Sequence, residues 1–79
     1  MKVHIDSIES SEIRHEMRLD SYQYADLLGT YHNDDGEARL YRAADTIVLD
    51  FNGIAFFKGC EDFRFWCEKF SINLSEVAS

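Results

Sequence analysis

Two cysteines and three histidines are the side chains of this chain best suited to catalysis or metal binding. Cys60 follows a glycine at the expected start of a helix, where the helix dipole lowers a thiol pKa, but Glu61 and Asp62 oppose that effect. No two of these five side chains stand at the close spacing that is typical of zinc ligands. The sequence therefore predicts neither an enzyme nor a metal or cofactor site.

Carboxylates are far more abundant than any other reactive group. The chain has 15 acidic and 8 basic residues in 79 and a formal net charge of −7. Nine of the acidic residues but only three of the basic ones lie in residues 1–37. This balance disfavours direct binding to nucleic acid or to an anionic membrane, and it is compatible with a basic protein partner. The alternative is that the carboxylates only keep a small domain soluble.

Sequence features also bear on redox state and location. Cys60 and Cys67 are seven residues apart on the expected helix, which places their Cα atoms roughly 10 Å apart, too far for a disulfide. We expect reduced thiols, with Cys67 in the core. The N-terminus lacks the apolar region of a signal peptide, and no apolar run approaches the about 18 residues that span a bilayer. These features predict a cytoplasmic protein without a membrane contact.

The elements that could position the charged groups are clearest in residues 46–70. Asn52-Gly53 predicts a type I′ turn between two strands, with Phe51 opposite Ile54 and Leu49 opposite Phe56. One face of this hairpin is then apolar. After it, apolar side chains recur at the spacing of one helical stripe, which should pack on that face. These side chains are Phe63, Trp66, Cys67 and Phe70.

The rest of the chain gives weaker periodic signals. Residues 37–43 predict a strand, which the turn sequence "NDDG" would connect back to a strand at 28–32. Residues 13–20 alternate as a strand would, yet they also fit a helix, and we favour a helical segment over 7–28 with a break near Asp20 and a stop at Gly29. The sequence thus predicts one α+β domain over 1–79, in which a small antiparallel sheet of three or four strands packs against one C-terminal helix and a helical N-terminal segment.

The candidate binding residues are acidic side chains and one aromatic ring. On a helix, Glu9, Glu12 and Glu16 would share one face, and on a strand Glu12, Glu16 and Asp20 would do so. Phe65 lies on the charged side of the expected C-terminal helix, where an aromatic ring is typical of an interface centre, unless the N-terminal segment buries it. Tyr22, Tyr31 and Tyr41 are further surface candidates. The full binding set is Glu9, Glu12, Glu16, Asp20, Asp26, Asp34, Asp35, Glu37 and Phe65, with Asp6 beside it.

In size, charge and α+β pattern, the chain resembles small acidic inhibitor proteins, which include phage anti-CRISPR, antirestriction and toxin-immunity proteins. Neither "TIVLDFNGIAFFKG" nor "CEDFRFWCEKF" carries a motif of one family, so the resemblance is one of type. It implies an inhibitor that binds a basic nucleic-acid-handling protein or ribonucleoprotein complex through a negatively charged surface and blocks nucleic-acid binding. The alternatives are a homodimeric structural or adaptor module, or a toxin-immunity protein.

Overall fold

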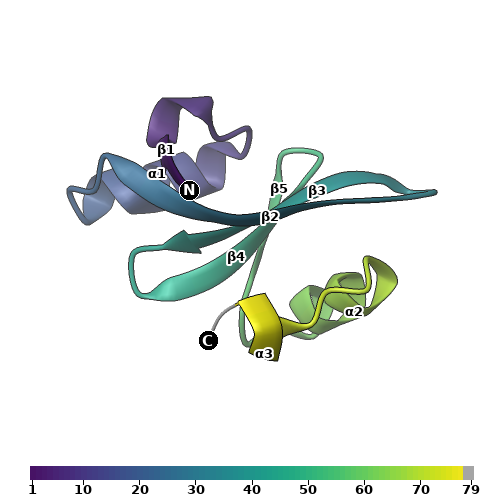
Figure 1. Cartoon of the computed structure of the whole chain (residues 1–79). Helices are drawn as coiled ribbons and strands as arrows, with labels where there is room; N and C mark the ends of the chain where they lie inside the picture. The colour runs from purple at the N-terminus through teal and green to yellow at the C-terminus, as the bar shows by residue number, and fades with distance from the viewer. Residues whose placement is uncertain (78–79) are drawn as a thin grey trace.

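The computed structural model describes residues 1–77 and shows a five-stranded antiparallel sheet with helices on both faces (Figure 1). The strands are β1 (Lys2–His4), β2 (Tyr24–Asn33), β3 (Gly36–Ala43), β4 (Thr46–Phe51) and β5 (Ile54–Phe57). The helices are the short 3₁₀ helix η1 (Ile5–Ser7), α1 (Ser11–Leu19), α2 (Glu61–Lys69) and α3 (Leu74–Val77). Strand order in the sheet follows the sequence, so β1 and β5 are its edges.

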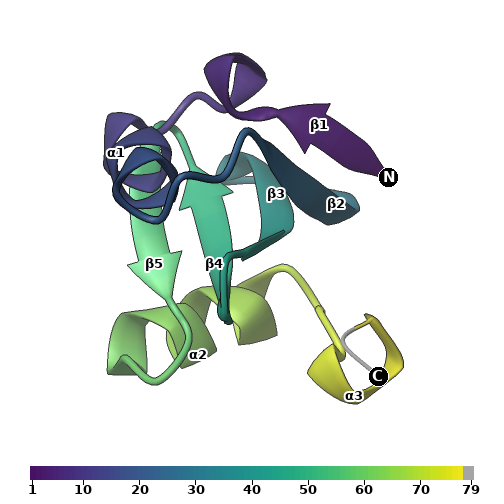
Figure 2. The ribbon, with the colours of Figure 1, turned by 90° about the vertical axis from the view of Figure 1, so that its left-hand side faces the viewer.

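Two separate hydrophobic cores lie on the two faces of the sheet (Figure 2). Alternate side chains of β3 and β4 enter opposite cores, because neighbouring residues of a strand point to opposite faces. On the α1 face, Ile13 and Met17 pack with Tyr41 and Val48. On the α2 face, the buried side chains are Ala38, Leu40, Ile47, Leu49, Phe51, Phe63, Cys67 and Phe70. Among the helices of residues 1–77, none has the length and apolar character that crossing a membrane requires.

The predicted α+β class is confirmed, and so are the C-terminal hairpin and the helix that follows it. Phe51 pairs with Ile54 and Leu49 pairs with Phe56. Asn52 and Gly53 have φ angles of 54° and 80°, as a type I′ turn requires. The α2 helix buries its apolar stripe against this hairpin, as its spacing indicates.

The sheet has five strands rather than three or four, and the prediction of a helix at 21–29 is wrong. Tyr24–Asn33 is strand β2. A β-bulge between Leu27 and Gly29 shifts the register, so Leu27 packs in the α1 core and Leu28 in the α2 core. The bulge breaks the period of two, and the apolar residues of this strand therefore imitate a helical spacing. Gly29 ends no helix, because it lies inside β2. A Cβ at this position would lie 2.6 Å from the Tyr31 hydroxyl oxygen, which favours glycine there.

The N-terminal helix is also shorter than the predicted segment. Ser10 is the N-cap of α1, and its hydroxyl accepts a hydrogen bond from the Ile13 N–H at 3.4 Å. The residues before Ser10 include β1 and η1. A three-residue strand and a single helical turn are too short to give a periodic pattern in the sequence.

A buried carboxylate joins the two halves of the chain. Asp50 lies in β4 and is only 4% exposed. One of its oxygens accepts a hydrogen bond from the Ser10 backbone N–H at 3.0 Å, and the other accepts from the Gly53 N–H at 3.2 Å. Asp50 therefore fixes the start of α1 relative to the β4–β5 turn.

Helices α1 and α2 end in the same way. Ser21 and Ser71 follow the C-cap residues with φ angles of 62° and 57°. The Tyr22 N–H donates to the Met17 carbonyl, and the Ile72 N–H donates to the Cys67 carbonyl, both at 2.9 Å. These are the long-range bonds of the Schellman motif, whose left-handed position is usually a glycine because a Cβ is strained there.

We expect Asp50→Ala to lower the free energy of unfolding by about 2–4 kcal/mol, because the buried Ser10 N–H loses its acceptor and the turn loses a bond. Urea denaturation followed by circular dichroism measures this. The matched control is Asp45→Ala, which removes an exposed carboxylate in the preceding turn and should change stability by no more than about 0.5 kcal/mol. Similar losses in the two variants would contradict the role of Asp50.

Replacing Ser71 by glycine should raise the free energy of unfolding by about 0.5–1 kcal/mol, since glycine adopts the left-handed conformation without steric strain. The same measurement on Ser71→Ala provides the control, because alanine keeps the Cβ and should give no gain. Equal stabilisation by alanine and glycine would show that backbone strain is not the cause.

Candidate functional site

A hollow of about 980 Å³ on the described surface lies along α2 and the segment that follows it. Its lining includes the polar groups of Cys60, Arg64 and Glu68 and the ring of Phe65. No histidine lines it, so the Cys60 thiol has no imidazole base beside it there. Within residues 1–77, no three His, Cys, Asp or Glu side chains gather as a metal site would need.

The two thiols differ in exposure. Cys67 is buried in the α2 core, as predicted, and burial raises its pKa to about 11. Cys60 is exposed at the N-cap of α2, and both thiols are free. At neutral pH the Cys67 thiol is both protonated and inaccessible, so reagents in solvent reach Cys60 alone.

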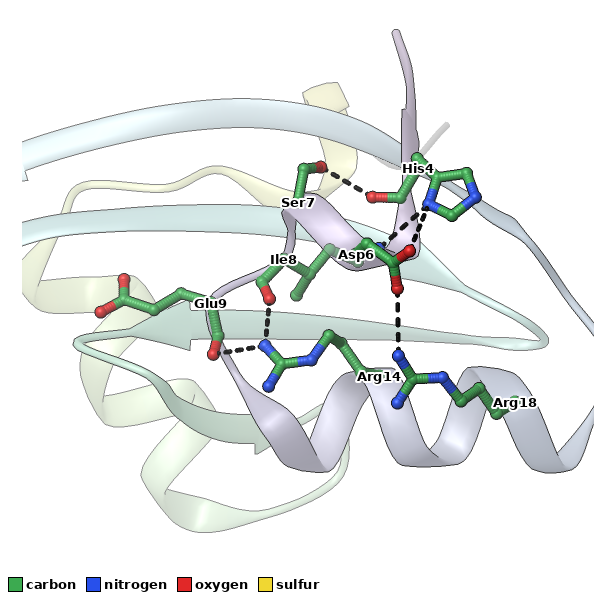
Figure 3. A network of polar contacts seen from close by, with 7 residues as sticks. All are labelled: His4, Asp6, Ser7, Ile8, Glu9, Arg14 and Arg18. Atoms are coloured by element: carbon green, nitrogen blue, oxygen red, sulfur yellow. Dashed lines mark hydrogen bonds and ion pairs between the residues drawn. The ribbon is translucent and has the colours of Figure 1, made fainter.

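The two arginines of α1 point toward η1 (Figure 3). An Arg18 guanidinium nitrogen lies 3.0 Å from a carboxylate oxygen of Asp6. Arg14 donates to the backbone carbonyls of Ile8 and of Glu9, the second at 2.8 Å. The positive charges of α1 are thus engaged with the segment that precedes the helix.

The glutamates of α1 occupy the opposite flank, about 160° around the helix axis from the arginines. Glu12 and Glu16 are one turn apart and exposed, and neither takes part in an ion pair within residues 1–77. We call this pair the acidic flank. Glu9 lies outside the helix, which corrects the predicted three-residue helical face. The Glu9 side chain lies against the β4–β5 turn: its Cγ is 3.7 Å from the point where a Cβ would stand if Gly53 had a side chain.

Two of the other predicted acidic residues are engaged in ion pairs. Asp26 faces Lys2 across the β1–β2 ladder at 3.8 Å. Glu37 contacts Arg39 at 2.8 Å. These pairs reduce the local negative charge, so Asp26 and Glu37 contribute less to an acidic surface than the sequence indicates.

Two of the last three acidic candidates lie apart from the acidic flank, whereas Asp20 follows Glu16 by one helical turn. Asp34 and Asp35 form the exposed tip of the β2–β3 hairpin, where the Asn33 side chain accepts a bond from the Asp35 N–H at 2.8 Å. Asp20 is the exposed C-cap of α1. The structure therefore distributes the predicted set over several places, with Glu12 and Glu16 together and Asp34 and Asp35 together.

Phe65 is half exposed on α2, on the other face of the sheet from the N-terminal segment, which therefore does not cover it (Figure 1). Its ring meets Trp66 edge-on with centroids 5.2 Å apart, and the Lys69 ammonium lies 5.5 Å from its centroid. Trp66 also approaches Phe56 of β5, at 6.2 Å between centroids. Ile54, predicted as core, is 59% exposed on the same face of β5, because it begins an edge strand.

The three tyrosines proposed for the surface have different positions. Tyr22 is exposed, Tyr31 is half-buried, and Tyr41 is only 2% exposed, so the prediction is wrong for Tyr41. Burial raises the pKa of Tyr31 and of Tyr41. Tyr41 is a core residue because its side chain lies on the face of β3 that packs against α1.

Thiol alkylation by iodoacetamide at pH 8 should modify one cysteine in the folded protein and two in urea. The reason is that Cys67 is buried and protonated below its raised pKa, whereas Cys60 is exposed. Intact-mass spectrometry counts the adducts. The control variant Cys60→Ser should show none while folded, and rapid modification of that variant would contradict the burial of Cys67.

No family model, no curated protein and no solved structure matches this chain. Its function must therefore be inferred from its own side chains and their placement.

Proposed function

We propose that this protein is a small acidic inhibitor, not an enzyme, that binds a basic nucleic-acid-handling protein or ribonucleoprotein complex and blocks nucleic-acid binding. The observation that supports this most is the acidic flank. Glu12 and Glu16 face solvent without an ion pair in residues 1–77, while the arginines of the same helix are engaged with the segment that precedes it. One side of α1 therefore presents carboxylates without compensating cations.

Surfaces that bind nucleic acid carry rows of lysine and arginine, and these side chains bind carboxylate oxygens much as they bind phosphate oxygens. A net charge of −7 steers such a surface toward the protein and raises the association rate. Exposed aromatic rings such as Phe65 would then slow dissociation. Partners of this kind act in the cytoplasm, where free thiols such as Cys60 persist.

A homodimeric structural or adaptor module is the second candidate. It draws support from the exposed apolar side chains of Ile54 and Phe65 and from the unpaired outer edge of β5. The two functions differ in their salt dependence, because a contact between apolar surfaces survives at salt concentrations that screen charges.

The test is a pull-down with the tagged protein from a lysate of its source organism, washed at low and then high salt. We expect the wild type to retain a nucleic-acid-binding protein at low salt and the variant Glu12→Gln/Glu16→Gln to retain several-fold less. The control Asp34→Asn/Asp35→Asn changes the charge equally at the distant hairpin tip and should retain nearly as much as the wild type.

Fluorescence anisotropy with the purified partner and its labelled nucleic acid then measures inhibition. The wild type should displace the nucleic acid, and the acidic-flank variant should need several-fold more protein to do so. Undiminished nucleic-acid binding in the presence of excess wild type would overturn the inhibitor proposal.

A further inference from the structure

The backbone of β5 has a strand partner on one side only. Ile54 and Phe56 pair toward β4, and the Lys58 N–H continues that ladder by donating to the Ile47 carbonyl at 2.9 Å. Backbone groups of an antiparallel strand alternate in direction, so the N–H and C=O groups of Ala55 and Phe57 point away from β4. The carbonyl of Gly53 points the same way, opposite to the N–H of Ile54.

Some outward groups at this edge are already satisfied. The Gly53 N–H donates to Asp50, and the Phe57 carbonyl accepts from the Cys60 N–H at 3.2 Å. Within residues 1–77, the groups left for another strand are the Gly53 carbonyl, both groups of Ala55 and the Phe57 N–H. They form a short ladder of donors and acceptors at hydrogen-bonding spacing, as an added strand requires.

The two edges of the sheet differ in protection. Natural edge strands carry charged side chains, prolines or bulges, or they are very short. β1 has only three residues, and its exposed side chains are Lys2 and His4. β5, "IAFF", carries no charge, proline or bulge. Of the two edges, β5 is therefore the one open to strand addition.

The α1 side of this open edge is acidic. Helix α1 packs over β5, and its arginines face η1, which lies toward the β1 side of the sheet (Figures 2 and 3). The opposite flank, with Glu12 and Glu16, consequently faces outward beyond β5. The Glu9 side chain lies at the turn end of the same edge, against Gly53.

The α2 side of the edge is apolar. Ile54 is 59% exposed, and the half-buried rings of Phe56 and Trp66 lie between the strand and α2. A strand added to β5 would present successive side chains to these two surfaces in turn, because its side chains alternate between faces.

We propose that the β5 edge accepts, as a sixth strand, an extended segment of the basic partner in which lysine or arginine alternates with apolar residues. This inference rests on the proposed function and specifies the part of the partner that binds. The basic side chains face Glu9, Glu12 and Glu16, and the apolar ones face Ile54 and Phe56. A second copy of this chain fits less well, because a symmetric β5 pair would bring two acidic flanks to the same face.

The probe is the synthetic peptide KVKVKVK with capped ends, titrated into the ¹⁵N-labelled full chain at low salt. We expect saturable shifts of the Ala55 and Phe57 amides, together with slower hydrogen exchange at both. The control peptide KKKKVVV has the same charge and composition without alternation and should bind at least about tenfold more weakly. Equal binding of the two peptides, or shifts that leave both amides unchanged, would overturn the strand-addition proposal.

Two variants test the backbone hydrogen bonds and the charge attraction separately. Ala55→Pro removes an outward N–H, which an edge strand tolerates, and should abolish binding of KVKVKVK while the circular dichroism spectrum stays unchanged. Glu12→Lys/Glu16→Lys changes only exposed side chains and should weaken binding at least tenfold even if the proline variant does not fold. Unchanged affinity in this second variant would overturn the proposal.

The oligomeric state gives a further outcome. A peptide-free dimer with protected Ala55 and Phe57 amides would show that a second copy occupies the edge, and the proposal would be wrong. If the peptide fails but the partner pull-down still depends on Glu12 and Glu16, strand addition is excluded and the inhibitor function stands. If the pull-down also fails, both are excluded.

Discussion

The position of α1 over the sheet depends on the buried carboxylate of Asp50. Ser10 and Asp50 are 40 residues apart in sequence, and their hydrogen bond holds the N-cap of α1 over β4. A buried carboxylate is costly unless N–H groups satisfy it, so the cap of α1 and the turn after β4 must both form for Asp50 to stay buried. The same contact places Glu9 beside Gly53. Stability and the position of the proposed binding surface thus share one constraint.

Size explains why an edge is left open. Helices α1 and α2 have nine residues each and are therefore about 14 Å long. Five strands at roughly 4.8 Å spacing are wider than one helix of about 10 Å diameter can cover. Helix α1 packs on β5, and α2 packs on β4 and β5, over the faces of the sheet. The backbone at each outer edge therefore relies on the sequence of its own strand for protection. β1 has that protection and β5 lacks it.

The elements that the sequence predicts well have local signals. Asn52 and Gly53 favour the positive φ angles of their turn, and the apolar side chains of α2 recur at helical spacing over two turns. β2 was not predictable in this way, because its bulge at Leu28 mixes the strand period with a helical one. The burial of Asp50 depends on a partner 40 residues away, which no local pattern reveals.

The acidic character of the site follows from composition, but its arrangement does not. Glu12 and Arg14 alternate in sequence, so a strand would mix their charges, and only the helix separates them into two flanks. The arginines contact acceptors in residues 6–9, a segment whose position depends on β1 joining the sheet. The sequence likewise identifies Phe65 as exposed but not the β5 edge beside it.

The combination of an acidic flank with an open strand edge has consequences for specificity. An uncharged edge would pair with any exposed strand, including that of a second copy, because backbone hydrogen bonds carry no sequence information. In the proposed complex, the carboxylates above β5 would repel another copy of this acidic chain and attract a basic segment. They would thus weaken binding of the wrong partner as well as strengthen binding of the right one. Solubility alone would explain carboxylates spread evenly over the surface. The proposed interaction would also account for a helix whose arginines contact the preceding segment while its glutamates, which form no ion pair within residues 1–77, lie on the opposite flank.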